Sequence, residues 1–397
     1  MKIAIVGAGI TGLFAAYYLR RDSHDVTLLD RDQSPREASI YNGGLLTPSF
    51  APTPTLGLGS LILSALTPRG ALYFSLRQVV SHASWYSLSL RQGLSGFEDR
   101  TIRLGKASLE LYKNYFREEN IDPDVKLGVL GLYKREDEAK KFAERFGAKF
   151  VAAAEIQRIG LKELEGGVDL ESELAVNPPK LVEQLKKKVL SMGVRLVAGR
   201  EVELERASEN SVRMRIESQE TDSFDKIIIS AGAWTAPLCQ KLGYDPKILP
   251  ASGLAMIFNT KGKQILSRAI LLEDYGISMS QHDESTLRVT SFFQMVGFRK
   301  NYGPSRKKWL YDIIRKHVTD LSQLELLDEG IGFRPCTPDQ FPVIGQIPGV
   351  KNLYIVSGNC RLGVTLAPVS ACILKSILSG ESYFDDLRAN LDPSRFS

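Results

Sequence analysis

The chain has 397 residues, of which 43% are hydrophobic and 24% are charged, a composition typical of an ordinary soluble globular protein. Its 51 basic and 46 acidic side chains leave a formal net charge of only +5, and the basic residues are scattered, which argues against nucleic-acid binding. A chain of this length exceeds what one hydrophobic core usually serves, so we expect two domains.

The first thirty residues predict a dinucleotide-binding βαβ unit. An apolar strand over residues 3–6 runs into the segment GAGITG at residues 7–12, and a second strand over residues 26–29 ends at Asp30. The three glycines allow a tight turn, close approach of the backbone to a pyrophosphate, and close packing of the following helix on the sheet. The N–H groups at the start of that helix then face the phosphates, and Asp30 is placed to accept hydrogen bonds from a ribose.

Two adjacent glycines, Gly43 and Gly44, follow Asn42 and precede a proline-rich run. Such a turn has little packing value of its own, so we expect its backbone to lie against a ligand. The apolar stretch over residues 56–66 is too short to span a bilayer. We expect it to pack as a loop and short helix on the protein's own core, with contact to a membrane surface or a partner subunit as the alternative.

The rest of the chain predicts helices and strands in an order typical of an α/β fold. The strand over residues 224–230 is strongly apolar and ends in Ala-Gly-Ala, which indicates a parallel sheet whose carboxyl end faces a ligand. Residues 248–291 hold several strand-like runs separated by turn signals, the pattern of an antiparallel sheet. Helices are predicted over residues 100–119, 136–145, 178–192, 305–318 and from about 366 to 378, and further strands over residues 125–133, 194–197, 202–204, 212–216 and 352–356.

The four cysteines, Cys239, Cys336, Cys360 and Cys372, show no C-x-x-C spacing and no metal-ligand grouping with the four histidines. This distribution favours a reducing compartment and predicts no metal site. Because Met1 and Lys2 lead directly into a core strand, we expect no signal peptide and a cytoplasmic location, with peripheral membrane association as the alternative.

Together these features resemble the D-amino-acid oxidase superfamily of FAD-dependent enzymes, especially its glycine oxidase and D-amino acid dehydrogenase branches. The resemblance implies an α/β fold with a Rossmann-type FAD-binding domain, over residues 1–50, 166–245 and 330–397. It also implies a discontinuous substrate-binding domain of antiparallel sheet plus helices, over residues 51–165 and 246–329. Beyond the first thirty residues the likeness rests on residues 39–44 and 194–234, on GFRP at 332–335, TPD at 337–339 and PVIG at 342–345, and on GNCRLG at 358–363 with LAP at 366–368.

By this resemblance, FAD rather than NAD is the expected cofactor, and residues 361–365 would present a helix start to the flavin ring, where N–H donors favour the reduced state. Some members of the family attach flavin through a cysteine five residues before the Thr of the TPD motif. That place is Gly332 here and Cys336 is out of register, so we expect non-covalent FAD. The implied cofactor-binding residues are Gly7, Ala8, Gly9, Ile10, Thr11, Gly12, Asp30, Arg31, Ser39, Asn42, Gly43, Gly44, Val202, Ala231, Gly232, Trp234, Gly332, Gly358, Arg361, Leu362, Gly363, Val364 and Thr365.

Three residues are candidates for the reaction site. Arg334 matches the arginine that holds the substrate carboxylate in this family, a task suited to its planar fork, with a structural salt bridge as the alternative. Arg361 coincides with a second arginine of the glycine oxidase pattern and would share the carboxylate, rim the site or serve a structural role. Tyr275 lies where the family places a substrate-facing tyrosine, although the register allows Ile277 instead. His24, His82, His282 and His317 match no family site.

The function implied by the resemblance is FAD-dependent oxidation of a small amino acid, a D-amino acid or glycine-like, by hydride transfer to flavin N5. The imino acid product is then hydrolysed by water, and the electrons pass to oxygen or to a quinone or dye acceptor. The alternatives are a secondary-amine dehydrogenase of the proline or sarcosine type and a flavin-holding subunit of a larger electron-transfer complex. An NAD-dependent dehydrogenase is a third, more remote alternative.

Overall fold

The computed structural model describes residues 1–33, 38–50, 70–91, 97–208, 210–217, 219–220 and 223–396. The apolar stretch over residues 56–66, for which a membrane or partner contact was an alternative, lies outside these residues. Within the described ranges, none of the helices combines the length and the apolar character that crossing a bilayer requires.

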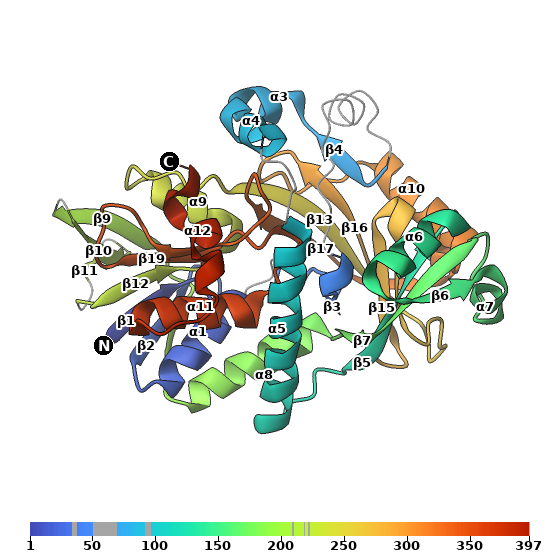
Figure 1. Ribbon diagram of the computed structural model, residues 1–397, viewed down its shortest axis with the longest axis horizontal. Helices are drawn as coiled ribbons and strands as arrows, with labels where there is room; N and C mark the ends of the chain where they lie inside the picture. Colours follow the sequence, from blue (N-terminus) through green and yellow to red (C-terminus); the bar gives the residue numbers. More distant parts are fainter. Residues whose placement is uncertain are drawn as a thin grey trace.

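A six-stranded sheet, built from strands of the beginning, middle and end of the chain, lies in the left half of Figure 1 and has the order β18-β19-β12-β1-β2-β8. Its strands are parallel except for β18, which pairs antiparallel with β19 at the edge. Parallel strands bring their carboxyl ends to one edge of the sheet, which is where ligands bind in such folds. The strands are β1 (Lys2–Val6), β2 (Asp25–Asp30), β8 (Arg195–Ala198), β12 (Lys226–Ile229), β18 (Val343–Gln346) and β19 (Leu353–Ser357).

Both faces of this sheet are covered, as the continuous apolar strands require. Helices α1 (Ile10–Arg21), α5 (Phe97–Glu118), α8 (Pro178–Ser191) and α11 (Ala367–Ser379) share one apolar cluster with its first face. On the other face, α9 (Thr235–Gln240) and a small antiparallel sheet complete a second cluster. That small sheet consists of β9 (Val202–Ser208), β10 (Ser211–Ile216) and β11 (Gln219–Glu220).

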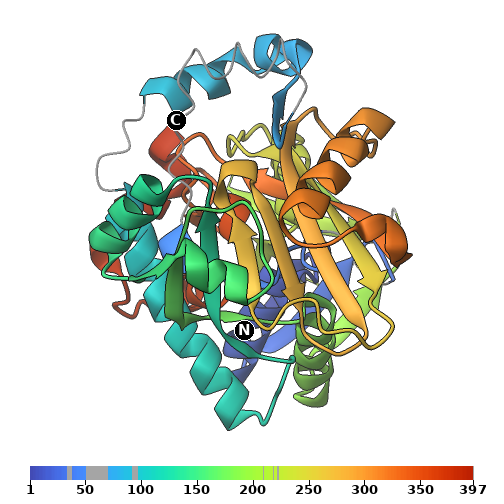
Figure 2. The same cartoon turned by 90° about the vertical axis from the view of Figure 1, so that its right-hand side faces the viewer.

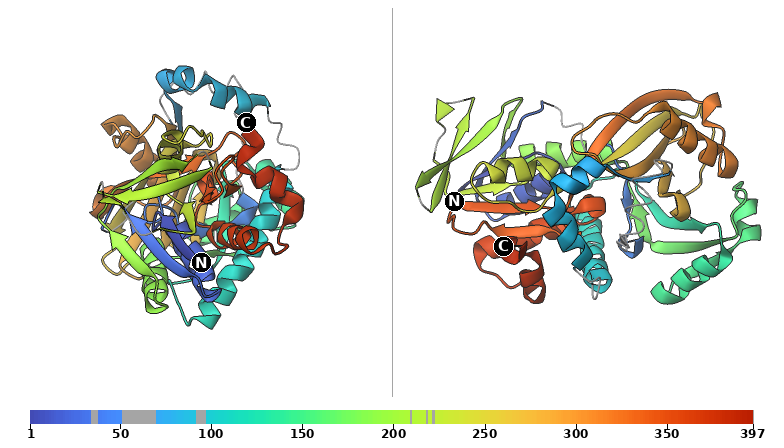
Figure 3. Two further views of the ribbon diagram at one scale, coloured as in Figure 1. Left: turned by 90° about the vertical axis from the view of Figure 1, so that its left-hand side faces the viewer. Right: turned by 90° about the horizontal axis from the view of Figure 1, so that it is seen from above.

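A ten-stranded, mostly antiparallel sheet forms the other half, and Figure 3 shows the two sheets following one another along the long axis of the molecule. The main order is β17-β13-β16-β15-β14-β5-β7-β3, with β4 beside β16 and β6 beside β7. The strands are β3 (Leu45–Leu46), β4 (Leu72–Phe74), β5 (Lys126–Tyr133), β6 (Lys149–Ala152), β7 (Gly166–Ala175), β13 (Leu249–Asn259), β14 (Ala269–Leu272), β15 (Ile277–Gln281), β16 (Thr286–Met295) and β17 (Glu325–Cys336).

Helices cover the outer side of this second sheet (Figure 2). Helix α10 (Pro304–His317), drawn in orange, buries Leu310 and Ile314 in the same apolar cluster as strands β13, β15 and β16. Helix α6 (Glu136–Phe146) packs against β7 through its alanines. The remaining α-helices are α3 (Leu76–Ser81), α4 (Ala83–Arg91), α7 (Ala153–Arg158) and α12 (Arg388–Leu391).

The observed fold class is the one expected from the sequence, an α/β unit joined to an antiparallel sheet with helices. The strands β7 and β17 belong to the ten-stranded sheet. The domain division predicted from the sequence assigns β7, and β17 from residue 330 onward, to the FAD-binding part. Strand β17 therefore carries the GFRP segment on the second sheet and delivers it to the edge of the first.

Candidate active site

A cavity of about 380 Å³ runs from the carboxyl edge of the six-stranded sheet to the inner face of the ten-stranded sheet. This volume falls in the range of small-molecule and cofactor sites. The residues implied by sequence as cofactor ligands converge here: Gly7, Gly9, Ile10, Thr11, Asp30, Arg31, Ser39, Asn42, Gly43, Gly44, Val202, Ala231, Gly232, Trp234, Gly332, Gly358, Arg361, Leu362, Gly363 and Val364 all line it. Ala8, Gly12 and Thr365 are not part of the lining.

The glycines of the first turn sit where no other residue fits. Gly7 has a φ of 113°, and a Cβ there would lie 2.3 Å from the carbonyl oxygen of Ser230. A Cβ at Gly12 would lie 2.0 Å from the carbonyl oxygen of Gly7, so the helix packs directly on the turn. Both contacts are the close approaches for which a dinucleotide-binding turn uses glycine.

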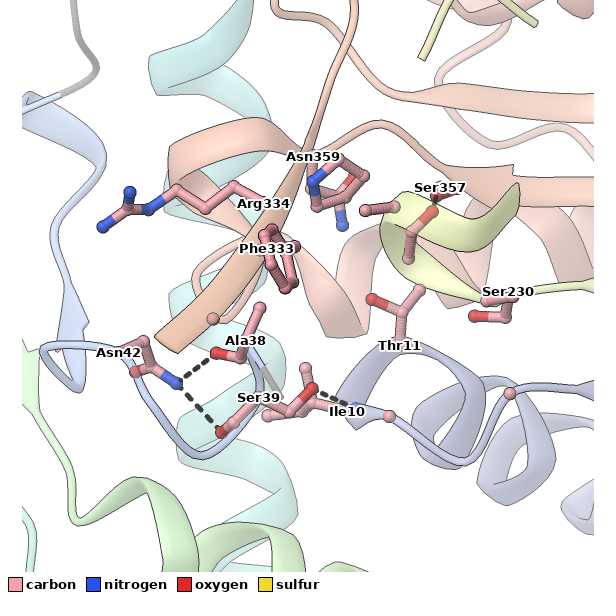
Figure 4. Close-up of a pocket in the computed structure, with 18 of the residues that line it drawn as sticks. Ile10, Thr11, Ala38, Ser39, Asn42, Ser230, Phe333, Arg334, Ser357 and Asn359 are labelled. Atoms are coloured by element: carbon pink, nitrogen blue, oxygen red, sulfur yellow. Dashed lines mark hydrogen bonds between the residues drawn. The ribbon is translucent and has the colours of Figure 1, made fainter. Parts of the chain in front are cut away.

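The start of helix α1 faces the cavity with its backbone donors. No side chain caps this helix at Gly9, and Ile10 N donates to the hydroxyl of Ser39 over 3.0 Å. Figure 4 shows Thr11 and Ser39 on either side of this helix start. Asn42 fixes the neighbouring loop by donating to the carbonyl oxygens of Ala38 and Ser39 and accepting from Gly44 N. The backbone N–H groups at the start of a helix bind phosphate.

The acidic residue at the end of β2 is held in place by backbone donors. Asp30 accepts from Ala8 N over 2.7 Å and from Asp32 N over 2.9 Å, and burial raises the pKa of its carboxyl. A carboxylate accepts about four hydrogen bonds, so capacity remains for ribose hydroxyls. Ala8 does not line the cavity, but its backbone N–H holds the Asp30 carboxylate in place. The glycine turn at Gly7, Gly9 and Gly12 (the glycine cradle), the start of α1 and Asp30 together fit an FAD molecule.

Aromatic side chains form the wall between the two ends of the cavity. Trp234 and Phe333 meet edge to face, with ring centroids 5.6 Å apart, and the guanidinium carbon of Arg31 lies 4.0 Å from the Trp234 ring centroid. These rings provide an apolar surface of the kind a planar cofactor packs on.

At the far end of the cavity, Arg334 extends from β17 with its guanidinium directed away from Phe333 (Figure 4). Its Nη1 donates to the carbonyl oxygen of Phe292 over 2.8 Å and to that of Ser252 over 3.4 Å. The Phe292 carbonyl is available because the pairing of β13 with β16 shifts register here, and Phe292 itself has a φ of 70°. A bulge of this kind aims groups at sites that a regular ladder would not reach.

Neither Arg334 nor Arg361 forms an ion pair with a carboxylate among the described residues. Burial lowers the pKa of Arg334 to about 10, the nearby Tyr302 counteracts this shift, and the charge of Arg361 adds to it. Arg361 presents accessible surface, but into the enclosed cavity, and the loss of bulk water lowers its pKa, an effect that Glu273 opposes. Two neighbouring guanidinium groups without an ion-pair partner are a site for an anion.

Tyr275 and its alternative, Ile277, are not brought to the arginines. The Tyr275 hydroxyl is 3.0 Å from Nε2 of His317, and its ring packs against Trp309 on α10. Ile277 is buried in the apolar cluster of the second sheet. From the same turn, Gly276 lines the cavity and Glu273 does not; burial raises the pKa of the Glu273 carboxyl, and the charge of Arg361 opposes this rise.

Two of the cysteines form a disulfide, which the sequence-based expectation of a reducing compartment did not include. Cys336 and Cys360 are 24 residues apart in the chain and are joined where β17 meets the short 3₁₀ turn η5 (Cys360–Leu362). Cys336 lies two residues after Arg334, and Cys360 directly precedes Arg361. The disulfide therefore links the two segments that carry the arginines. Spacing rules such as C-x-x-C do not detect a pair formed by tertiary contact.

Comparisons with known proteins identify the family of this chain. A family model described as FAD dependent oxidoreductase matches residues 2–376. The D-amino acid dehydrogenase of Allorhizobium ampelinum is 27% identical over 100% of this chain and 99% of its own length, and that of Neisseria gonorrhoeae is 25% identical over 96% of each.

Solved structures share the fold. The iminodiacetate oxidase of Chelativorans has a TM-score of 0.78 at 19% identity, covering 99% of both chains. The L-proline dehydrogenase of P. horikoshii has a TM-score of 0.76 at 18% identity, covering 100% of this chain and 97% of its own. The glycine oxidase of Geobacillus kaustophilus has a TM-score of 0.75 at 19% identity, covering 99% and 98%. The sequence-based assignment is thus confirmed, and the chain belongs to the family of FAD-dependent oxidoreductases.

Proposed function

We propose that this protein oxidises the α C–N bond of a small amino acid, a D-amino acid or glycine-like substrate, by hydride transfer to FAD. The observation that carries the proposal is the pair of guanidinium groups, Arg334 and Arg361, on the wall of the cofactor cavity with no carboxylate partner among the described residues. A substrate carboxylate supplies the missing negative charge. The names of the D-amino acid dehydrogenase and glycine oxidase relatives support this substrate class.

The residues that would hold FAD are those of the glycine cradle, the start of α1 and Asp30, with residues 361–365 beside the flavin ring. When bound, the flavin accepts the hydride of the substrate's α-carbon at N5. The protein's share of the work is orientation. Arg334, fixed by the Phe292 carbonyl, anchors the carboxylate in a bidentate grip, and Arg361 adds a second positive charge. The imino acid leaves for hydrolysis by water, and the electrons pass to oxygen or to a quinone or dye acceptor.

We also propose that FAD is bound non-covalently. The family position for covalent attachment is Gly332, and the nearby Cys336 has its sulfur in the disulfide with Cys360. Acid precipitation of the purified protein should therefore leave the yellow colour in the supernatant. Flavin that remains with the pellet would contradict this part of the proposal.

The experiment that tests the function is an anaerobic spectrum recorded while D- and L-amino acids, proline, sarcosine and iminodiacetate are added one at a time. Bleaching of the flavin identifies the substrate, its hand, and whether the amine is primary or secondary, and recovery in air shows whether oxygen is an acceptor. Arg334→Ala should keep FAD but lose bleaching, whereas Arg315→Ala, an exposed arginine of α10, should behave as the parent. Equal bleaching of parent and Arg334→Ala would refute the carboxylate anchor.

A further inference from the structure

An arginine of the second sheet holds the loop that precedes β3. Nη1 of Arg288, on β16, donates to the carbonyl oxygen of Ile40 over 3.0 Å and to that of Asn42 over 3.3 Å. Ser280, which pairs with Arg288 on β15, extends its hydroxyl to 3.5 Å from the carbonyl oxygen of Gly43. Two neighbouring strands therefore hold the same loop through its backbone.

The guanidinium of Arg288 lies close behind the cavity wall. Side chains two residues apart on a strand point to the same face, and Thr290, two residues after Arg288, lines the cavity. The loop that Arg288 holds, residues 40–44 (the cofactor loop), lines the cavity from Tyr41 onward. Because two residues of a strand span about 7 Å, we place the charge of Arg288 within about 10 Å of the cavity.

The cofactor loop lies at the end of the cavity where the flavin ring is proposed to bind. The hydroxyl of Thr365 donates to the carbonyl oxygen of Leu45 over 3.2 Å, which connects the end of the loop to residues 361–365, the segment proposed to lie beside the ring. Figure 4 shows Asn42, of this loop, on the side of the site where Arg334 lies. A charge held behind the loop is therefore near the flavin rather than near the adenosine.

The charge of Arg288 is only partly offset by its surroundings. Within the part of the chain that the structure describes, no carboxylate forms an ion pair with Arg288, which is 8% exposed. Burial lowers its pKa to about 10, and Asp328 and Tyr41 oppose this shift. Asp328 itself is exposed and accepts from the Tyr41 hydroxyl over 3.3 Å. Arg288 therefore stays protonated, and positively charged, at neutral pH.

A hydride brings two electrons and one proton to a flavin, so the ring gains one negative charge on reduction. A positive charge that the protein holds nearby stabilises this reduced form more than the neutral oxidised form. We propose that the charge of Arg288, held behind the cofactor loop, shifts the bound FAD toward its reduced state. This inference rests on the placement of the flavin in the proposed function, but it does not depend on which substrate supplies the hydride.

The test measures the reduction potential of bound FAD against a reference dye, during slow reduction by dithionite at pH 8 and without any amino acid. At an effective dielectric constant of about 20, a unit charge about 10 Å away changes such an equilibrium by roughly tenfold. Arg288→Gln should therefore lower the ratio of reduced to oxidised FAD about tenfold at a fixed potential, which is about 30 mV for a two-electron couple. Arg288→Lys keeps the charge and should stay near the parental potential.

Two further variants make the test independent of the folding of Arg288→Gln. Asp328→Asn removes the carboxylate that opposes Arg288 from the surface, so it should raise the ratio of reduced to oxidised FAD a few-fold. Arg268→Gln is the matched control, because Arg268 is also partly buried in the second sheet but donates to Asp169 over 2.6 Å, which offsets its charge. That variant should lose stability and keep the parental potential.

The measurement separates the charge of Arg288 from simple support of the loop. A loop that only loses support would bind oxidised and reduced FAD more weakly by the same factor, which leaves the potential unchanged. A parental potential in Arg288→Gln, or the same low potential in Arg288→Gln and Arg288→Lys, would overturn the inference. If Arg288→Gln does not retain FAD, a potential of Asp328→Asn at or below that of the parent would overturn it. None of these results involves an amino acid, so the proposed function stands or falls separately by the bleaching experiment.

Discussion

Alanine at Gly253 should displace the carboxylate anchor without unfolding the protein. The residue lies on β13 opposite Gly332 of β17, and an ideal Cβ there would stand 2.3 Å from Nη2, 2.4 Å from Nη1 and 2.6 Å from Cζ of Arg334. These three contacts involve only the far end of a flexible side chain. The new methyl group therefore pushes the guanidinium aside, while the backbone of the strand stays in place.

The size of the displacement follows from the contact distance. An ordinary contact begins at 3.4 Å, so the guanidinium must move by about 1 Å, enough to weaken its 2.8 Å hydrogen bond to the Phe292 carbonyl. A misplacement of about 1 Å at a positioning group costs about 100-fold in rate. We therefore expect kcat/KM of Gly253→Ala for the best amino acid substrate to fall by about two orders of magnitude, with the FAD content unchanged. Stopped-flow reduction of the flavin under anaerobic conditions measures this fall directly.

The matched control is Gly303→Ala, at the start of α10, where a Cβ meets nothing within 4 Å. That variant should reduce its flavin at the parental rate. A Gly253→Ala protein that binds FAD, melts like the parent and is reduced just as fast would show that the position of Arg334 does not matter to the reaction.

Three further predictions concern stability. Glu173→Gln should stabilise the protein by about 1–3 kcal/mol at pH 8 and hardly at pH 4. Burial raises the pKa of Glu173 from 4.5 to about 7 in the folded protein. The free energy of unfolding of the parent therefore falls as the pH rises from 4.5 to about 7, whereas glutamine does not titrate. Urea unfolding at the two pH values measures this. Asp169→Asn should cost about 2 kcal/mol in the same assay, since its buried carboxylate accepts two hydrogen bonds from Arg268. Reducing the Cys336–Cys360 disulfide should lower the free energy of unfolding by up to about 3.5 kcal/mol of chain entropy, and with it the melting temperature. It should also weaken substrate binding, because the segments that carry the two arginines are no longer linked. A melting curve and a substrate titration that are indifferent to reductant would contradict the last prediction.

The sequence predicts the fold well because its strongest patterns are local. The glycine segment, the second strand and the proline that opens α8 are short-range signals, and each element appears within a few residues of its predicted position. Antiparallel pairing over residues 248–291 could also be read from alternating strands and turns. What the sequence could not supply was the assignment of β7 and β17 to the second sheet, since both are long strands whose partners lie far away in the chain.

The candidate site divides in the same way. Most of the residues predicted for the cofactor end line one cavity, because a phosphate-binding turn is built from one turn and one helix start that are local in the sequence. The reaction end is assembled from β13, β16, β17 and η5, and its main determinants are tertiary. The bulge at Phe292 and the disulfide that joins Cys336 to Cys360 have no local signature.

Arg334 and Arg361 lower the stability of the ligand-free protein, and binding of an anion offsets this loss. Loss of hydration inside the cavity lowers the pKa of both guanidinium groups, and the charge of Arg361 lowers the pKa of Arg334 further. The fold holds them there through a bulge carbonyl on one side and a disulfide on the other. Such an arrangement is not expected of a structural salt bridge, which would bring its own carboxylate. It is expected of a site that binds an anionic group beside a cofactor, because the anion compensates the unpaired positive charge.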